Sequence, residues 1–457
     1  MKTAATEATA LAALDFPVFL TAYDPSDLPG SSLDPLGFER GYLFLADKIL
    51  PGLTNVADRP RYLSVLCAGA FLAEVDVSDP PRLQYQQRLD CILRFERFWT
   101  LANVLAAREC SDGAFPVSGI RGVTYASAKV ESLLRSRSRR TDADFQLLSR
   151  QVPYGVVGVY GAVAGGMRFI DRKTLTLTPD LGERLGEGFL QQTETPNVLI
   201  KAVKNRSDIA VGKLTEWGLR SHLAGEAIPV EHKCFAEALH RDAVRSRMTE
   251  VLSHYPFRGD GDTELSRFQR LLPALAAHEE NKDLHEAVAA TLAYEDAYRL
   301  AMLGFERLLW LCRILPAAAI ESFDIDSDQV LSHVCAALPA ASQRFSSALA
   351  SAVTEQFRQD SHRLEDTRRF LERAAAACGS RSALTRELVD RHFDVQQGKF
   401  DKGRRKMPWL EVTADRISLT MTRVGGLDRE ATLPTSIAPH PYRLSSADAL
   451  IAAARGA

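Results

Sequence analysis

Two short segments of this chain gather basic side chains at spacings that suit phosphate binding. The first segment has four arginines interspersed with serines: Arg135, Arg137, Arg139 and Arg140. The second is a glycine-containing loop with five cations: Lys399, Lys402, Arg404, Arg405 and Lys406. Guanidinium groups bind phosphate oxygens in pairs, and the neighbouring Phe400 and Trp409 offer rings on which bases stack. Both segments are therefore candidate nucleic-acid contacts. The alternatives are a solvated linker for the first and a loop paired with acidic helix faces for the second.

Familiar catalytic and metal-binding patterns are missing from the sequence. The ten His residues never form His-Glu-x-x-His, and the seven Cys residues never show Cys-x-x-Cys spacing. No phosphate loop, no dinucleotide fingerprint after a strand and no Gly-x-Ser-x-Gly elbow occurs. Acidic residues between 279 and 296 lack the Glu-x-x-His pair of a carboxylate metal site, so we expect a solvated acidic helix face there. We therefore expect no cofactor, no metal site and no catalytic residue.

The stretch from Thr141 to Gln192 changes its hydrophobic period twice. Phe145, Leu147 and Leu148 open a helical pattern, and residues 154–164 form a second, mostly apolar helix. Residues 169–178 then alternate as a hairpin around the polar turn 171–173. Thr178 and Pro179 suit the start of the next helix, as N-cap and first helical residue.

This order of helix, helix, hairpin and helix resembles a winged helix. The run Leu-Thr-Leu-Thr-Pro-x-x-Gly-x-x-Leu at 175–185 looks like the wing exit of bacterial regulator families. The resemblance covers about 50 of the 457 residues. It implies that wing residues Arg168, Arg172 and Lys173 contact the phosphate backbone. The second helix offers Val and Tyr rather than base-reading side chains, so we expect weak sequence preference. A structural or protein-docking module is the alternative.

Three N-terminal phrases carry a second resemblance. They are Asp34-Pro-Leu-Gly, Leu50-Pro-Gly-Leu-Thr-Asn and Arg59-Pro-Arg-Tyr. Together they resemble an uncharacterised bacterial family of anti-phage defence gene clusters. This resemblance covers about 40 residues, contains no catalytic motif, and implies a role in antiviral defence.

Helical periodicity dominates the remaining chain. The residues 81–108, 284–315 and 384–397 are expected to be helices, and His392, Gln396 and Lys399 share a face whose favoured role is structural. Residues 339–377 read as one unbroken helix of about 58 Å whose apolar stripe packs on a bundle or a partner. Strands are expected only near 169–178 and 409–422.

We predict a mainly α fold, a helical multi-domain protein with a winged-helix-like module and a small α+β C-terminal region. The expected segments are a helical domain, the winged-helix-like module, a domain of long helices and the α+β region, at 1–126, 127–195, 196–379 and 380–457. The formal net charge of -2 gives no global basic field, so any nucleic-acid site must be local. Scattered cysteines, a short N-terminal apolar run and no apolar span favour a cytoplasmic protein without membrane partner.

The leading hypothesis is a non-enzymatic subunit of a bacterial complex. It would bind nucleic acid, with DNA as the first expectation, and dock other protein subunits through its long helices. One alternative is a protein–protein scaffold without nucleic-acid binding. Another is an enzyme, such as a nuclease, with a dispersed site.

Overall fold

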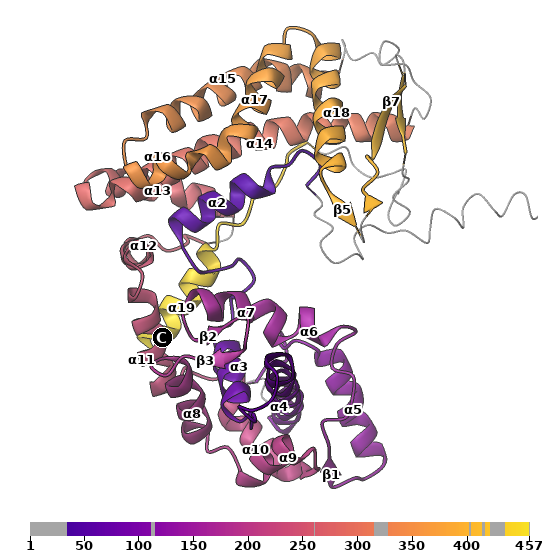
Figure 1. Ribbon diagram of the computed structural model, residues 1–457, viewed down its shortest axis with the longest axis vertical. Helices are drawn as coiled ribbons and strands as arrows, with labels where there is room; N and C mark the ends of the chain where they lie inside the picture. Colours follow the sequence, from indigo (N-terminus) through magenta and orange to yellow (C-terminus); the bar gives the residue numbers. More distant parts are fainter. Residues whose placement is uncertain are drawn as a thin grey trace, which may run out of the picture. The chain divides into compact units, whose positions relative to one another are not determined.

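The computed structural model describes residues 34–110, 115–259, 261–314, 328–401, 404–413, 416–420 and 435–456, which are mainly helical (Figure 1). Their strands form four two-stranded sheets, β1–β4, β2–β3, β5–β6 and β7–β8. The predicted mainly α class is confirmed, and these ranges contain no central sheet.

The chain forms two compact units, each assembled from segments distant in sequence. Unit 1 comprises the described parts of Met1–Leu45 and Leu272–His440, and unit 2 those of Ala46–Leu271 and Pro441–Ala457. The four segments expected above are, by contrast, consecutive. The helices α2 (Glu39–Ile49) and α13 (Glu264–Ala276) run through unit boundaries.

Unit 2 is built around one long helix, α4 (Pro81–Glu109), as the sequence predicts. The other helices of this unit are α3 (Arg61–Phe71), α5 (Val123–Arg135), α6 (Gln151–Tyr154), α7 (Val156–Gly166), α8 (Gly182–Gln192), α9 (Asn197–Asn205), α10 (Val211–Ser221), α11 (Pro229–His240), α12 (Ala243–His254) and α19 (Leu444–Arg455). Its strands are β1 (Arg140–Thr141), β2 (Ile170–Asp171), β3 (Thr176–Leu177) and β4 (Ile209–Ala210).

Figure 1 views α4 nearly along its axis, and α3, α5, α7, α9 and α10 pack on it. Trp99 of α4 is fully buried and meets Tyr62 edge-on at a ring distance of 5.0 Å. The backbones of α10 and α4 come close together at Gly218. A Cβ on this residue would lie only 2.1 Å from the carbonyl oxygen of Ala102, so a larger residue would clash there. Burial of these apolar faces is the main stabilisation of the unit.

The winged-helix-like stretch is present in part. The hairpin is confirmed, since Ile170 pairs with Leu177 and Asp171 with Thr176, and α7 matches the predicted second helix. The first predicted helix is wrong, because residues 142–150 are irregular. The Asp142 carboxylate accepts the backbone N–H of Asp144, and Arg97 binds the carbonyl oxygen of Ala143, so neither group is free for a helical ladder. Strand β1 pairs with β4 rather than with the hairpin. The winged-helix assignment itself stays a prediction.

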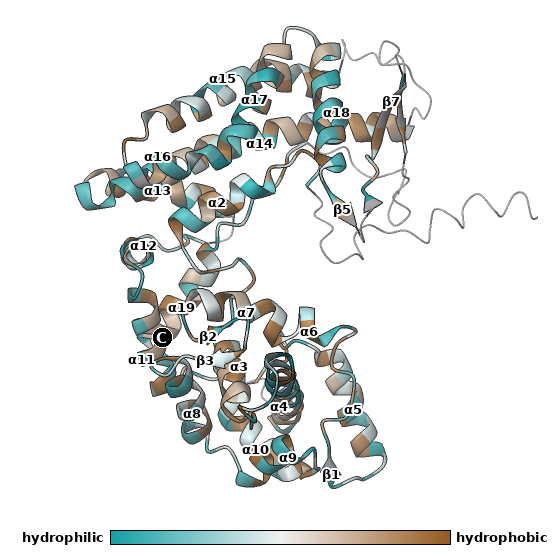
Figure 2. Cartoon of the chain, viewed as in Figure 1, coloured by the Kyte–Doolittle hydropathy of each residue, from teal (hydrophilic) through white to brown (hydrophobic). Residues whose placement is uncertain are grey.

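Unit 1 is a helical bundle with two small hairpins. Its elements include α14 (Lys282–Ile314), α15 (Gln329–Ser351), α16 (Glu355–Asp360), α17 (Glu365–Ala377), α18 (Arg381–Gln397), β5 (Phe400–Asp401), β6 (Arg404–Arg405), β7 (Leu410–Thr413) and β8 (Arg416–Leu419). The helices α14, α15, α17 and α18 pack on one another. In Figure 2 they carry brown and teal residues along their length, which is the pattern of amphipathic helices.

The unbroken helix predicted for 339–377 is wrong. The backbone turns extended at Ala352 and Thr354, and separate helices follow. Glu286 of α14 causes the break, because its carboxylate accepts the backbone N–H groups of Val353 and Thr354 at the start of α16. The stripe residues Phe345, Phe357, Leu364 and Leu371 are buried, so the bundle itself covers them.

The acidic stretch 279–296 is only partly a solvated face. Glu286 binds backbone groups as described, and Glu295 is fully buried. His440 Nδ1 lies 2.6 Å from a carboxylate oxygen of Glu295, and Tyr42 stacks on the His440 ring. The expectation of a solvated face is therefore wrong for these two carboxylates, which serve internal contacts.

The polar face of α18 has the structural role that was favoured. His392 Nδ1 lies 3.0 Å from the carbonyl oxygen of Pro35, and its Nε2 accepts the backbone N–H of Trp409. Lys399 Nζ donates to the carbonyl oxygen of Asp34. Burial lowers the pKa of His392 to about 4, so the ring stays neutral and anchors the segment before α2.

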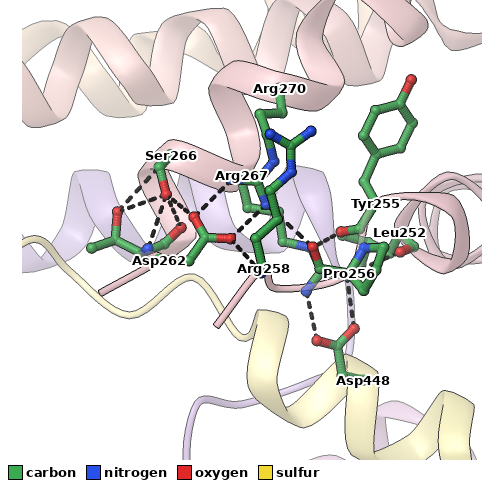
Figure 3. Close-up of polar contacts among 10 residues, drawn as sticks. Leu252, Tyr255, Pro256, Arg258, Asp262, Ser266, Arg267, Arg270 and Asp448 are labelled. Carbon is green, nitrogen blue, oxygen red and sulfur yellow. Dashed lines mark hydrogen bonds and ion pairs between the residues drawn. The ribbon is translucent and has the colours of Figure 1, made fainter. Parts of the chain in front are cut away.

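A buried ion-pair cluster joins α12, α13 and α19 within unit 2 (Figure 3). The Arg267 guanidinium is fully buried and binds both carboxylate oxygens of Asp448, at 2.6 and 2.9 Å. It also donates to the carbonyl oxygens of Leu252 and Tyr255. The neighbouring Asp262 pairs with Arg270.

None of the helices in the described ranges combines the length and the apolarity that a membrane span requires.

Candidate nucleic-acid interface

The first basic segment lies on the surface of unit 2 between α5 and β1. Arg135 is the last residue of α5, and Arg137 has a left-handed backbone with a φ of 52°. All four arginines are exposed. Arg140 is neutralised by a bidentate pair with Asp208, at 2.8 Å for both contacts. Arg135, Arg137 and Arg139 have no ion-pair partner among the described residues.

The strand pair β1–β4 sets this segment beside a cavity. Arg140 pairs with Ala210 and Thr141 with Ile209. Residues 142–144, which follow β1, and residues 206–207, which precede β4, line a cavity of about 300 Å³. The end of the basic segment and the cavity lining are therefore joined through one strand pair.

Three arginines that the sequence had not singled out line the cavity: Arg94 and Arg97 of α4, and Arg206 after α9. Arg94 donates through Nε to the carbonyl oxygen of Val203 at 2.7 Å. Arg97 donates through Nε to Gln151 at 2.8 Å and through Nη1 to the carbonyl oxygen of Ala143 at 3.2 Å. These bonds hold both side chains in place. Both Nη groups of Arg94 and the Nη2 group of Arg97 have no hydrogen-bond partner among the described residues.

The same cavity has three carboxylates and an apolar floor. Asp90 pairs with Arg206 at 3.3 Å, and Asp142 pairs with Lys129 at 3.1 Å. Asp144 is exposed. The apolar lining consists of Leu93, Phe98, Ala143 and Ala202. Burial lowers the pKa of both Arg94 and Arg97, because desolvation disfavours their charged form.

A hydrogen-bonded chain links Arg97 to a buried carboxylate. Gln151 accepts from Arg97 and donates to Glu96 Oε2 at 2.7 Å. Glu96 Oε1 accepts the backbone N–H of Val156 at 2.7 Å, so it caps the start of α7. Burial raises the pKa of Glu96 to about 7, although the hydrogen bonds from Gln151 and Val156 oppose the rise.

This carboxylate predicts a pH dependence of stability. The folded state binds the Glu96 proton more tightly than the unfolded chain, whose Glu pKa is 4.5. The free energy of unfolding should therefore fall as the pH rises from about 4.5 to 7, by about 3 kcal/mol. Urea unfolding of the wild type and of Glu96→Gln at several pH values measures this contribution, which the variant should lack.

Comparing the wild type with Glu96→Gln also separates the pH effect of Glu96 from that of His222, whose contribution to the free energy of unfolding changes with pH in the opposite direction. Burial lowers the pKa of His222 to about 4, so its neutral ring contributes stability that is lost as the pH falls from about 6.5 to 4. The His222 contribution is the same in the wild type and in Glu96→Gln, so it cancels when one free energy of unfolding is subtracted from the other. Parallel stability curves for wild type and variant would contradict the assignment to Glu96.

The wing residues lie elsewhere on unit 2. Arg168, Arg172 and Lys173 are exposed on and beside the β2–β3 hairpin, and Arg168 has a φ of 63°. Figure 1 shows this hairpin well apart from β1. The structure therefore does not bring the wing and the first basic segment together.

The second basic segment belongs to unit 1 and is a hairpin rather than a loop. Lys399 is half-buried with a pKa lowered by burial, and Lys406 is buried. Arg405 is exposed and contacts Gln397 at 3.4 Å. Lys402 and the side chain of Arg404 lie outside the described residues. Of the described cations, only Arg405 remains open to a ligand.

The missed arginines left a signal in the sequence. Asp90, Arg94 and Arg97 follow one another at i, i+4 and i+7, which places them on one face of α4. The apolar stripe through Ile92, Phe95 and Trp99 occupies the buried side. Arg206, in contrast, reaches the cavity only through the pairing of β1 with β4.

Neither a comparison with known proteins nor a search for metal-ligating side chains assigns a role to this surface. No protein-family model, no curated protein and no solved structure matches the chain. No group of three or more His, Cys, Asp or Glu side chains within the described ranges is placed to hold a metal ion. The case for a site depends on the geometry given above.

Proposed function

We propose that unit 2 binds the phosphate backbone of nucleic acid without strong sequence preference. The contacts come from Arg135, Arg137 and Arg139, supported by the neighbouring arginine-lined cavity. The observation that carries the proposal is three exposed guanidinium groups within five residues, none of them paired with a carboxylate of the described ranges. Such groups are typical of backbone contacts, which position a protein on a strand without reading its bases.

The local charge balance supports the same proposal. Several other exposed cations of this unit have acidic partners, as in Arg108 with Glu131 and Lys213 with Glu216. The segment from 135 to 139 lacks such partners within the described chain. Because like charges repel, an unpaired basic segment is stabilised when an anion such as a phosphate backbone lies against it.

The test is the triple substitution R135Q/R137Q/R139Q. We expect the affinity for unrelated 20-base-pair duplexes to fall at least about tenfold at moderate salt. The slope of log affinity against log salt should decrease by about 2 to 3, because fewer counterions are released. Fluorescence anisotropy titrations at several salt concentrations measure both quantities, with duplex DNA and duplex RNA as separate probes.

A matched control removes the same number of positive charges from unit 1. Arg358, Arg369 and Arg373 are exposed and paired with Glu355, Glu365 and Glu387. Their replacement by Gln should leave binding unchanged. If the R135Q/R137Q/R139Q protein binds as the wild type does, the proposal fails. If the wild type binds no duplex or single strand at any salt, a protein–protein scaffold becomes the better description.

We also propose that the protein acts within a bacterial defence complex. The support for this role is the resemblance of the three N-terminal phrases to the family of anti-phage defence gene clusters. Docking of partner subunits on the long helices has less support, since the bundle of unit 1 buries Phe345, Phe357, Leu364 and Leu371, while Val353 of the same stripe is exposed.

A further inference from the structure

The arginine cavity has properties that backbone binding does not require. Its volume of about 300 Å³ is at the lower end of ligand pockets and matches one nucleotide rather than a strand. Its apolar lining includes Phe98 and Ala202, and its charged lining comprises Arg94, Arg97 and Arg206 together with Asp90, Asp142 and Asp144. Most of the lining is charged or polar, and convergent polar groups fix the orientation of a bound small molecule.

The arginines of the cavity are held ready for an anion. Arg94 and Arg97 are fixed through Nε, so their terminal amino groups need no reordering when a ligand binds. Arg206 carries the same charge as Arg94, so the two guanidinium groups repel each other, and Asp90, which pairs with Arg206, offsets part of this repulsion. A doubly charged phosphate between them would remove this repulsion and accept bidentate hydrogen bonds.

The carboxylates of the cavity leave room for such an anion. Asp90 and Asp142 are engaged by Arg206 and Lys129. Asp144 is the remaining carboxylate, and it is exposed at the surface, where water screens its charge. Arg94 and Arg97 are half-buried, whereas Asp144 is exposed and available to accept a hydrogen bond from a sugar hydroxyl.

We propose that this cavity binds the phosphate monoester of a single nucleotide, with Arg94 and Arg206 as the phosphate ligands and Arg97 as a supporting donor. The nucleotide has two possible sources. One is a free mononucleotide. The other is the terminal nucleotide of a strand, and only this source rests on the function proposed above.

The first part of the test uses free ligands. Isothermal titration calorimetry with AMP and UMP should show binding, whereas adenosine, which lacks the phosphate, should bind at least tenfold more weakly. The double variant R94Q/R206Q should weaken AMP binding at least tenfold. The single variant R94K keeps the charge but loses the forked geometry, and it should retain part of the affinity.

The second part uses 12-nucleotide single strands with a 5′-phosphate, a 3′-phosphate or only hydroxyl ends. If strand ends are the source, one phosphorylated form should bind at least tenfold tighter than the hydroxyl form, and R94Q/R206Q should abolish that difference. The control R82Q/R108Q removes two exposed cations from α4, about 18 and 21 Å along the helix from Arg94. It should bind every probe as the wild type does. Melting temperatures verify that all variants are folded.

The outcomes distinguish this proposal from the preceding one. AMP binding that R94Q/R206Q removes supports the cavity, even if no strand binds and the backbone proposal fails. Strands that bind irrespective of their end groups, together with undetectable AMP and UMP binding, overturn the cavity proposal and leave backbone binding intact. Equal AMP binding by wild type and R94Q/R206Q also overturns it.

Discussion

Replacing Glu231 by Ala is expected to lower the free energy of unfolding of unit 2 by about 3 to 5 kcal/mol. Glu231 is almost fully buried and pairs with the equally buried Arg61 at 2.8 Å. Its oxygens also accept from the Ser64 hydroxyl at 2.7 Å and from the backbone N–H of Ile228 at 2.9 Å. Removing the carboxylate leaves the buried Arg61 cation without its counter-ion, and the buried Ser64 hydroxyl and the half-buried Ile228 N–H without their acceptor, which is costly.

The double variant R61M/E231L gives the matched control. It replaces both charges by apolar side chains of similar size, and such replacements are often neutral. We expect it to be more stable than Glu231→Ala, although His222 and Glu226 lose the donors that Arg61 gives their carbonyl oxygens. Urea unfolding followed by the fluorescence of Trp99 and Trp217, in a background with Trp310 and Trp409 replaced by Phe, reports on unit 2 alone. A double variant as unstable as Glu231→Ala would mean that shape, not the unpaired charge, sets the loss.

Helices that depend on their own residues were predictable from the sequence. Both α4 and α14 carry periodic apolar residues, and their ends agree with the prediction within two residues. The same local rules failed at Ala352, where Glu286, 67 residues earlier than Val353, accepts the backbone N–H groups. A pattern read within one segment cannot include an acceptor from another helix.

Charge counting along the sequence has the same limit, because it does not show which cations the fold leaves exposed. Counting cations identified the segment from Arg135 to Arg140, which the structure leaves exposed. Counting also selected Lys399 and Lys406, which the fold directs into unit 1, where Lys399 binds a backbone carbonyl. Whether a cation faces solvent depends on long-range packing. The cavity arginines Arg94, Arg97 and Arg206 were overlooked because they do not lie in a run of basic residues, although the fold gathers them around one cavity.

Replacing Asp448 by Ala should be the second large loss, about 3 kcal/mol. The partner, Arg267, has no exposed surface, and Asp448 neutralises it with two hydrogen bonds (Figure 3). The carbonyl oxygens of Leu252 and Tyr255 and the ring of Phe257, 4.6 Å away, remain after the substitution. They offer partial charges only, and the nearby Glu264 carboxylate makes no direct ion pair with Arg267, so a full positive charge would stay buried without a hydrogen-bonded counter-ion.

The geometry ranks three variants of this cluster. Asp448→Asn retains one acceptor and should lie between wild type and Asp448→Ala. Arg267→Met removes the buried charge itself and leaves Asp448, about one third exposed, to be solvated by water, so it should be less harmful than Asp448→Ala. Urea unfolding in the same Trp background measures all three. An Arg267→Met protein less stable than Asp448→Ala would show that the carbonyl and ring contacts of Arg267, rather than charge compensation, hold α12, α13 and α19 together.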